Sequence, residues 1–410
     1  MINYEQGRIS QLINIAKREC KVNDIRSINA KNKAQILCGA LQLSVEELDT
    51  LLVCGSSILR TLNGHAFETV FDRILEYNGI ISKEIGGDTE IDREVNGLTL
   101  QLKTPYKAGS TDKYVQYKTH KTHGAKSEQE SLDYYSKVEH FADYLIGLIS
   151  YEPLAIAFLP KADLPKHGKD NRYILSPFKF HIEKDKINRF DILGINNVKI
   201  PGGIFNGDNE LLPKASKALN LNSEILIDTI LNASNFRLWD MNIRGFAREF
   251  SFLAFLKRNN VVAFNPAIAG LPRPEKSDAA LKTIDGTPVR FQVKGVTSKG
   301  CAFIEKNVKV DIETQLSRGR VNDHHTQSRL YLFSDFDYLI ITVDPYYICN
   351  FTNHTYGVGT FEWRFYCIPK NELKPHGKYP HRIASHQFIK FTELEKYRIG
   401  IEWLNNWLKN

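Results

Sequence analysis

The chain lacks an apolar run long enough to cross a membrane, and it lacks any paired-cysteine motif. A membrane span needs about 18 consecutive apolar residues, and the opening segment MINYEQGRIS has no apolar signal core. The six cysteines are scattered, and no two are spaced as CxxC. These absences indicate neither a zinc site nor a disulfide framework, so we expect a cytoplasmic protein with reduced thiols.

What is present is the composition of an ordinary globular protein. Hydrophobic residues make up 42% of the chain and charged residues 25%, which argues against disorder. A length of 410 residues allows two or three domains with full cores. The net charge of +7 is moderately basic and fits a polyanionic partner without requiring one.

Five segments of the first half recur in the second half in the same order. They are Ala40–Ser44 with Ala218–Asn222, Gly64–Glu68 with Gly245–Glu249, the two hairpins described below, Asp143–Ile146 with Asp337–Ile340, and Pro160–Lys169 with Pro369–Lys378. One match can arise by chance, but five in one order indicate a tandem duplication. We expect modules at 1–195 and 196–410, joined near Pro201-Gly202-Gly203, where chain breakers cluster.

Each half has the same predicted succession of elements. A helical lead-in precedes a long helix that ends near Leu75 or Leu256, with the G-x-A-x-E phrase near its start. A strand, a hairpin, a basic connection, a buried strand and a final strand follow. The predicted fold class is α/β, with a mixed β-sheet flanked by helices in each module.

The first hairpin turns at Asn96-Gly97, the strongest short hairpin signal. Residues symmetric about this turn face each other, so Asp92 faces Gln101, and Lys103 projects from the same face. Asp88 and Glu90 are rival acids, but this register puts them away from Gln101.

The second hairpin turns at Asp285-Gly286 and carries the same residues. Asp278 and Gln292 are symmetric about Asp285, and Lys294 follows in the place of Lys103.

This combination of side chains suits metal-dependent phosphodiester cleavage. A carboxylate and an amide oxygen that converge on one point fit a hard cation such as Mg²⁺. The predicted metal ligands are Asp92, Gln101, Asp278 and Gln292. Lys103 and Lys294 would orient or deprotonate the attacking water, and the helix glutamates Glu68 and Glu249 would reach the outer shell of the metal or a second metal.

An acid, then a ligand-x-Lys on the next strand, with a helical Glu before them, resembles the PD-(D/E)XK nuclease superfamily. The resemblance covers most of each half. It implies two tandem restriction-endonuclease-like modules and Mg²⁺ dependence, with Glu68, Asp92, Gln101 and Lys103 in one catalytic site. The matching residues of the other site are Glu249, Asp278, Gln292 and Lys294.

The chain departs from the pattern of this superfamily in two ways. Ile91 and Ser277 stand where a proline usually precedes the acid, and Gln replaces the usual acid before x-Lys. A neutral ligand should weaken metal binding. Because both halves carry Gln, we interpret it as inherited.

Basic residues after each hairpin are candidates for DNA contact. The segment 103–126 is rich in lysine, histidine and tyrosine, which suit phosphate contact and stacking. Arginines of the second half can bind guanine bidentately. The candidates are Lys107, Lys113, Lys118, Lys121, Arg318 and Arg320.

Three other features have a structural interpretation. Segment 33–51 is compatible with the start of a helix-turn-helix, but its echo at 214–231 favours a scaffold element. Asp143 and Asp337 precede apolar strands and are expected in turns or caps. His167 and His376 are expected in loops.

The expected function is a type II restriction endonuclease that cleaves double-stranded DNA as a monomer, its two modules forming a pseudo-dimer. A cognate DNA methyltransferase is the expected genetic partner. Two alternatives remain open: a repair or junction-resolving nuclease, and a DNA-binding protein with one or both sites degenerate.

Overall fold

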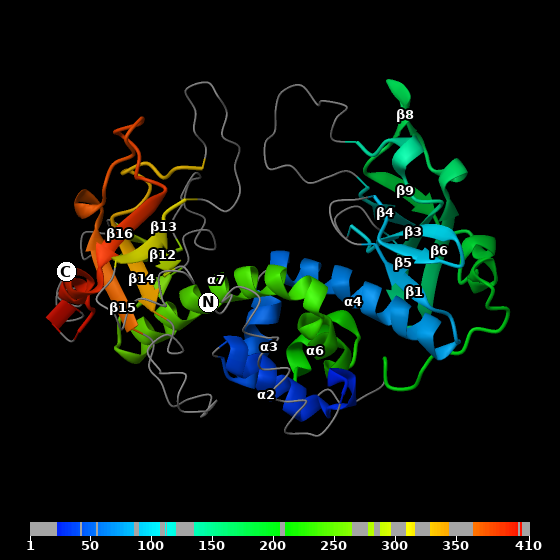
Figure 1. Ribbon diagram of the computed structural model, residues 1–410, viewed down its shortest axis with the longest axis horizontal. Helices are drawn as coiled ribbons and strands as arrows, with labels where there is room; N and C mark the ends of the chain where they lie inside the picture. Colours follow the sequence, from blue (N-terminus) through cyan, green and yellow to red (C-terminus); the bar gives the residue numbers. More distant parts are fainter. Residues whose placement is uncertain are drawn as a thin grey trace. The chain divides into compact units, whose positions relative to one another are not determined.

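The computed structural model describes residues 23–41, 43–54, 56–85, 90–106, 111, 113–119, 135–205, 210–264, 278–282, 288–296, 309–315, 329–343, 364–400 and 402–403 (Figure 1). The chain divides into two compact units. The first comprises Asp24–Ala34 and Val45–Arg237, and the second is built mainly from Leu238–Asn410.

Helices form one side of the first unit. They are η1 (Ile25–Ser27), the start of α2 (Ala30–Leu41), α3 (Val45–Cys54), α4 (Ser56–Tyr77), α5 (Pro213–Leu219) and α6 (Ser223–Leu231). The remainder of α2 and most of α7 (Ala233–Arg258) belong to the second unit. Local signals set the ends of α5 and α6. Pro213 opens α5, Asn220 ends it with φ of 54°, and the Asn222 side chain caps α6 by accepting from the Glu224 N–H at 2.9 Å.

The first unit contains a five-stranded mixed sheet in the order β1-β2-β3-β5-β6. All neighbours are antiparallel except β3 and β5, which are parallel. The strands are β1 (Ser82–Glu84), β2 (Arg93–Val95), β3 (Leu98–Lys103), β5 (Tyr144–Tyr151) and β6 (Leu154–Pro160). Smaller elements are the pairs β4 (Tyr114–Tyr117) with β9 (Phe178–His181) and β7 (Lys166–His167) with β8 (Asp170–Ile174), and the short helices η4 (Val138–His140), η5 (Lys161–Asp163), η6 (Lys184–Lys186) and η7 (Phe190–Leu193).

The second unit contains a sheet of the same topology, in the order β10-β11-β12-β14-β15. Its one parallel pair is again the third strand with the fourth, β12 with β14. The strands are β10 (Ala263–Phe264), β11 (Ala279–Lys282), β12 (Pro288–Gly295), β14 (Tyr338–Val343) and β15 (Arg364–Pro369). Smaller elements are the pair β13 (Lys309–Glu313) with β16 (His386–Lys390), α9 (Phe391–Leu394), η10 (Lys370–Glu372) and η11 (Glu395–Tyr397).

The parallel strands have the same register in both sheets. Gln101 pairs with Leu145, and Gln292 pairs with Leu339. Both units combine a mixed sheet with helices, which confirms the predicted α/β class.

Asp143 and Asp337 anchor these registers from the start of the parallel neighbour. Asp143 accepts from the Thr99 N–H at 2.9 Å, and Asp337 accepts from the Arg290 N–H at 3.0 Å. Each bond ties the strand that carries the glutamine to the start of the next strand. Both acids thus have a structural role, but they bond to the neighbouring strand and do not serve as the expected turn or cap residues.

A long helix covers each sheet through apolar contacts. In the first unit, α4 packs against β1 and β3 (Figure 1) and buries Phe67, Val70, Phe71 and Ile74. In the second, Phe252 and Leu256 of α7 join a core with the strand residues Phe291, Val293 and Ile340. Burying one such side chain contributes roughly 1.5–3 kcal/mol, so these helices hold the sheets firmly.

The position of the G-x-A-x-E phrase differs from the prediction. The long helices end near Leu75 and Leu256 as expected, but α4 begins at Ser56 and α7 at Ala233. Glu68 and Glu249 therefore lie well inside their helices, and the prediction that they lie near a helix start is wrong. The prediction took the repeated phrase as the start of each helix. The apolar periodicity of both helices, however, extends upstream of this phrase.

The helices after the predicted joint pack with the first unit. Asp49 of α3 accepts from the Lys214 and Ala215 N–H groups at 3.0 and 2.9 Å, and Thr229 of α6 bonds to Thr69 at 3.0 Å. The modules 1–195 and 196–410 thus describe the repeat in the sequence, whereas the compact units describe how the helices pack.

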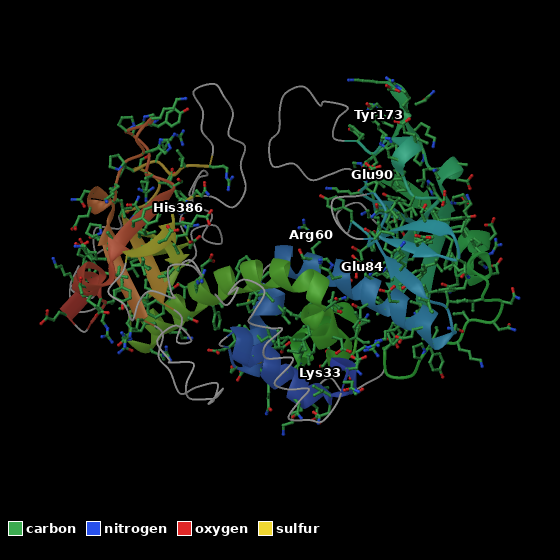
Figure 2. The ribbon with its side chains drawn as sticks, viewed as in Figure 1. Lys33, Arg60, Glu84, Glu90, Tyr173 and His386 are labelled. Atoms are coloured by element: carbon green, nitrogen blue, oxygen red, sulfur yellow. The ribbon has the colours of Figure 1, made fainter. Side chains whose placement is uncertain are left out.

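Segment 33–51 contains parts of α2 and α3, and its polar residues contact other helices of the first unit. The side chain of Lys33, which Figure 2 labels, is fully buried and donates to Glu224 and Asp228 of α6, both at 2.8 Å. This contact agrees with the scaffold interpretation.

Candidate active sites at the two hairpins

The first hairpin has the predicted register. Asn96 and Gly97 have φ of 49° and 79°, as a two-residue turn of type I′ requires. The flanking pairs are Arg93 with Leu100, Glu94 with Thr99 and Val95 with Leu98.

This register brings Asp92 and Gln101 together. The Gln101 side-chain amide donates to Asp92 Oδ2, and the Leu102 N–H donates to the same oxygen at 2.7 Å. Asp92 lies directly before β2, and its own N–H donates to the Leu100 carbonyl at 2.8 Å. The hydrogen bond agrees with the choice of Asp92 over Glu90, while Asp88 lies outside the described residues.

The second hairpin repeats these bonds one for one. Ala279 pairs with Phe291, which places Asp278 next to Gln292 as predicted. The Gln292 side-chain amide donates to Asp278 Oδ2, and the Val293 N–H donates to the same oxygen at 2.8 Å. Turn residues Asp285 and Gly286 lie outside the described residues.

Each lysine lies on the same strand as the glutamine, two residues further along. Lys103 is close enough to Asp92 to oppose the effect of burial, which raises the pKa of Asp92. Lys294 donates to the Gln315 carbonyl at 3.3 Å, and its Nζ lies 5.3 Å from the centroid of the Tyr331 ring. Burial lowers the pKa of Lys294, although Asp278 and Glu249 favour its charged form. A lysine with a lowered pKa is better able to accept a proton from water.

Each site contains one helix glutamate, and the pKa values of the two glutamates are shifted in opposite directions. Burial disfavours the charge of Glu68, but His65, Arg93 and Lys103 outweigh it and hold the pKa of Glu68 below its ordinary value. Burial and the neighbouring Asp278 raise the pKa of Glu249 to about 9. Burial likewise raises the pKa of Asp278 to about 6, against the effect of Lys294.

The sequence analysis did not single out the polar residues around Glu68, which are Arg93, Asp72 and His65. Arg93 is 4% exposed in its side chain, and its Nη2 lies 3.2 Å from Glu68 Oε2 and 2.9 Å from Asp72 Oδ2. His65 Nδ1 lies 3.5 Å from the other Glu68 oxygen. A residue-by-residue alignment of the two halves would have drawn attention to these polar residues, because the second half has no polar residue at the same positions.

In each site the glutamine turns its amide nitrogen toward the Asp carboxylate, so the predicted convergence of two oxygens is not seen. The oxygens that these bonds leave over still suit a hard divalent cation. One oxygen of the Asp carboxylate is bonded, and within the described residues no group donates to the Oε1 atom of Gln101 or Gln292. No group of three or more His, Cys, Asp or Glu side chains in the described part of the chain could hold a metal ion. A cation would therefore depend on the amide oxygen and on water, as Mg²⁺ sites commonly do.

The predicted DNA-contact residues are described only in part. Lys113 is exposed, and the Lys118 ammonium lies 3.5 Å from the centroid of the Tyr106 ring. On the β4–β9 pair, Lys179 lies 4.4 Å from the centroid of the Tyr114 ring. Lys107, Lys121, Arg318 and Arg320 lie outside the described residues.

His376 lies in a loop, as predicted, but His167 lies in β7, so the loop prediction is wrong for His167, which ends a short strand before the Gly168 turn. His167 Nδ1 accepts from the Lys169 N–H at 3.3 Å, and His376 Nδ1 accepts from the Lys378 N–H at 3.2 Å.

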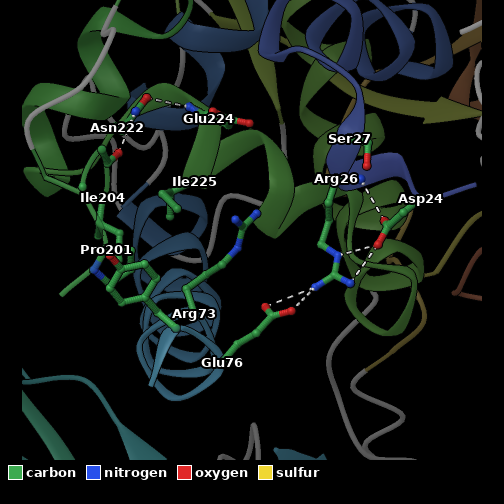
Figure 3. Close-up of a pocket in the computed structure, with 13 residues that line it drawn as sticks. Asp24, Arg26, Ser27, Arg73, Glu76, Pro201, Ile204, Asn222, Glu224 and Ile225 are labelled. Atoms are coloured by element: carbon green, nitrogen blue, oxygen red, sulfur yellow. Dashed lines mark hydrogen bonds and ion pairs between the residues drawn. The ribbon is translucent and has the colours of Figure 1, made fainter. Parts of the chain in front are cut away.

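A cavity of about 460 Å³ lies among the helices of the first unit, apart from the hairpin residues. Figure 3 shows that Arg26 at its wall is bonded to Asp24 and Glu76. Arg73, also in the wall, pairs with Asp228. Since internal carboxylates already hold these arginines, the hairpins are the better candidate sites.

Among the described helices, none is long and apolar enough to cross a membrane. Comparison of the chain with protein-family models and with curated proteins gives no match.

Proposed function

We propose that this chain is a Mg²⁺-dependent DNA endonuclease, most specifically a type II restriction enzyme with two restriction-endonuclease-like modules. The observation that carries the proposal is the repeated constellation of Asp, Gln and Lys. Both copies share the same hydrogen bonds and stand on the same strands of sheets with the same topology. Coincidence does not account for two such copies.

The residues of each site have complementary roles in the proposed reaction. A divalent cation held by Asp92 with Gln101, or by Asp278 with Gln292, would polarise the scissile phosphate and acidify a bound water. Lys103 or Lys294 would orient the attacking water and take its proton as the water oxygen bonds to phosphorus. The phosphorus–oxygen bond to the leaving sugar breaks, and the leaving oxygen takes a proton from solvent. The lysine ammonium, once formed, offsets the charge that develops on the phosphate oxygens.

Two sites in one chain suit a duplex, which needs two cuts. A symmetric homodimer supplies two sites by repetition, whereas a duplicated chain supplies both as a monomer. The two halves differ in sequence, so the target need not be a palindrome. A cognate methyltransferase would protect the DNA of the host cell.

The test is digestion of unmethylated phage DNA and supercoiled plasmid in Mg²⁺, followed by sequencing of the ends. We expect Lys103→Ala and Lys294→Ala, made separately, to convert linearisation into nicking of opposite strands. Lys184→Ala and Lys396→Ala are controls, since both lysines are exposed and lie away from the hairpins.

Three results would contradict the proposal or part of it. Intact double-strand cleavage by one lysine variant would show that its module is not catalytic. Cleavage of four-way junctions but not of plain duplex would indicate a junction-resolving enzyme. DNA retention in EDTA without cleavage in Mg²⁺ would indicate a binding protein.

A further inference from the structure

An arginine holds one oxygen of the Glu68 carboxylate in the first site, and a histidine lies near the other. Oε2 pairs with Arg93 at 3.2 Å, and Oε1 lies 3.5 Å from His65. Arg93 is itself fixed by Asp72, at 3.1 Å from Nε to Oδ1 and 2.9 Å from Nη2 to Oδ2, and by the Asp92 carbonyl at 2.9 Å. To bind a cation, Glu68 would have to leave this buried network.

The second site has apolar residues at all three positions. When Glu249 is aligned with Glu68, Phe246 and Leu253 take the places of His65 and Asp72. When Asp278 is aligned with Asp92, Ala279 takes the place of Arg93. Ala279 is 1% exposed, and Leu253 packs against the same core cluster. The network around Glu68 therefore has no counterpart around Glu249.

Glu249 has no fixed partner among the residues that the structure describes. No hydrogen bond or ion pair within those residues reaches its carboxylate, although Asp278 and Lys294 are close enough to influence it. The adjacent Arg248 does not replace Arg93, because its guanidinium lies against the backbone of Gly295, 1.9 Å from where a Cβ would stand.

A half-buried carboxyl group without a partner avoids the cost of its charge by staying protonated, whereas a bound cation would compensate the charged form. We propose that the two sites are unequal cation sites. Glu249 is a ligand of the cation in the second site, whereas His65 and Arg93 withhold Glu68 from the cation in the first. The inference rests on the proposed function for the presence of a cation and goes beyond it in separating the roles of the two glutamates.

The test is titration of the full chain with Mn²⁺, without DNA, followed by electron paramagnetic resonance of the free ion. We expect two classes of site with different affinities. Glu249→Gln should weaken the tighter class about tenfold or more, whereas Glu68→Gln should change either class by less than about twofold. The triple variant His65→Phe/Asp72→Leu/Arg93→Ala gives Glu68 the surroundings of Glu249, and it should tighten the weaker class.

Three outcomes would overturn the inference: one class of equal sites, equal losses from the two Glu→Gln variants, or no Mn²⁺ binding. The isosteric Glu→Gln pair decides the question even if the triple variant does not fold. Mn²⁺ binding is measured without DNA, so the two proposals can fail separately. A chain whose two sites bind Mn²⁺ with different affinities but that never cuts DNA would refute the proposed nuclease activity and support the unequal cation sites. A chain that cuts DNA with two equal sites would do the reverse.

Discussion

Gln292 donates a side-chain hydrogen bond to Asp278 and so joins the residue before β11 to the middle of β12. Gln292→Glu would replace this bond by two carboxylates in contact. We expect the metal-free protein to lose about 1–3 kcal/mol of unfolding free energy. Millimolar Mg²⁺ should restore more stability than it gives the parent, because a second anionic ligand strengthens the cation site. Thermal unfolding with and without Mg²⁺ measures both effects.

The reciprocal variant Asp278→Asn/Gln292→Glu is the matched control, since it restores one carboxylate and one amide. A single variant as stable as the parent in EDTA would contradict this account of the Gln292–Asp278 bond.

Asp337 should make the second unit less stable in acid. Burial disfavours its charge, but the Arg290 N–H and Lys370, whose Nζ lies 2.9 Å away, hold the pKa of Asp337 below its ordinary value. A lowered pKa in the folded state gives stability that is fully present above the ordinary pKa and is lost as pH falls through the lowered value. Asp337→Asn should therefore cost about 1 kcal/mol at pH 7, with the difference vanishing at low pH.

Urea unfolding at several pH values measures this difference. Glu393→Gln, at an exposed position of α9, should show no such trend. A constant difference between Asp337→Asn and the parent at all pH values would show that the charge of Asp337 is not the cause.

Lys33 should be essential to the helical side of the first unit. Lys33→Met leaves Glu224 and Asp228 without their shared ammonium, and breaking a buried pair in this way costs about 3–5 kcal/mol. Arg73 still pairs with Asp228, so we expect the lower end of that range. Lys31→Met, at an exposed position of the same helix, should change stability little. Equal effects of the two variants in chemical denaturation would refute the role of Lys33.

Gly147 leaves room for the ring of Tyr117 in the first sheet. A Cβ at position 147 would lie 2.4 Å from Tyr117 Cζ, and Tyr117 is fully buried with its hydroxyl donating to the Leu148 carbonyl at 3.0 Å. Gly147→Ala should therefore destabilise the fold by about 1–3 kcal/mol through overpacking. Gly168→Ala, where nothing lies within 4 Å, is the control. Differential scanning calorimetry that finds no difference between the two variants would argue against this contact.

Lys113 and Lys118 should contribute to DNA affinity and not to specificity. Each Lys→Ala variant should weaken binding to all sequences alike and reduce the slope of log K against log salt by about one. Fluorescence anisotropy in Ca²⁺ at several salt concentrations measures this slope. Lys184→Ala should leave it unchanged, and a change at one sequence only would indicate base reading in place of phosphate contact.

The hairpins could be predicted from the sequence because local signals determine them. The Asn96-Gly97 turn and the strand alternation are sufficient to bring Asp92 to Gln101. The surroundings of Glu68 could not be predicted in the same way. Arg93 reaches Glu68 and Asp72 from a different element, and such contacts depend on how a helix packs on a sheet.

The packing of α5 and α6 was also beyond local reasoning. Their own sequence echoes segment 33–51 and suggests a lead-in to the second module. The partners of these helices, Asp49 and Lys33, lie far away in the sequence, and no spacing pattern connects them.

The two hairpins reach the same site geometry across connections of different length. Two residues separate β2 from β3, whereas positions 283–287 separate β11 from β12. The glutamines nevertheless have one register, because Asp143 and Asp337 fix each strand from its parallel neighbour. The pairing of each glutamine strand with its parallel neighbour thus does not depend on the length of the hairpin connection, whereas the pairing within the first hairpin follows from its Asn96-Gly97 turn.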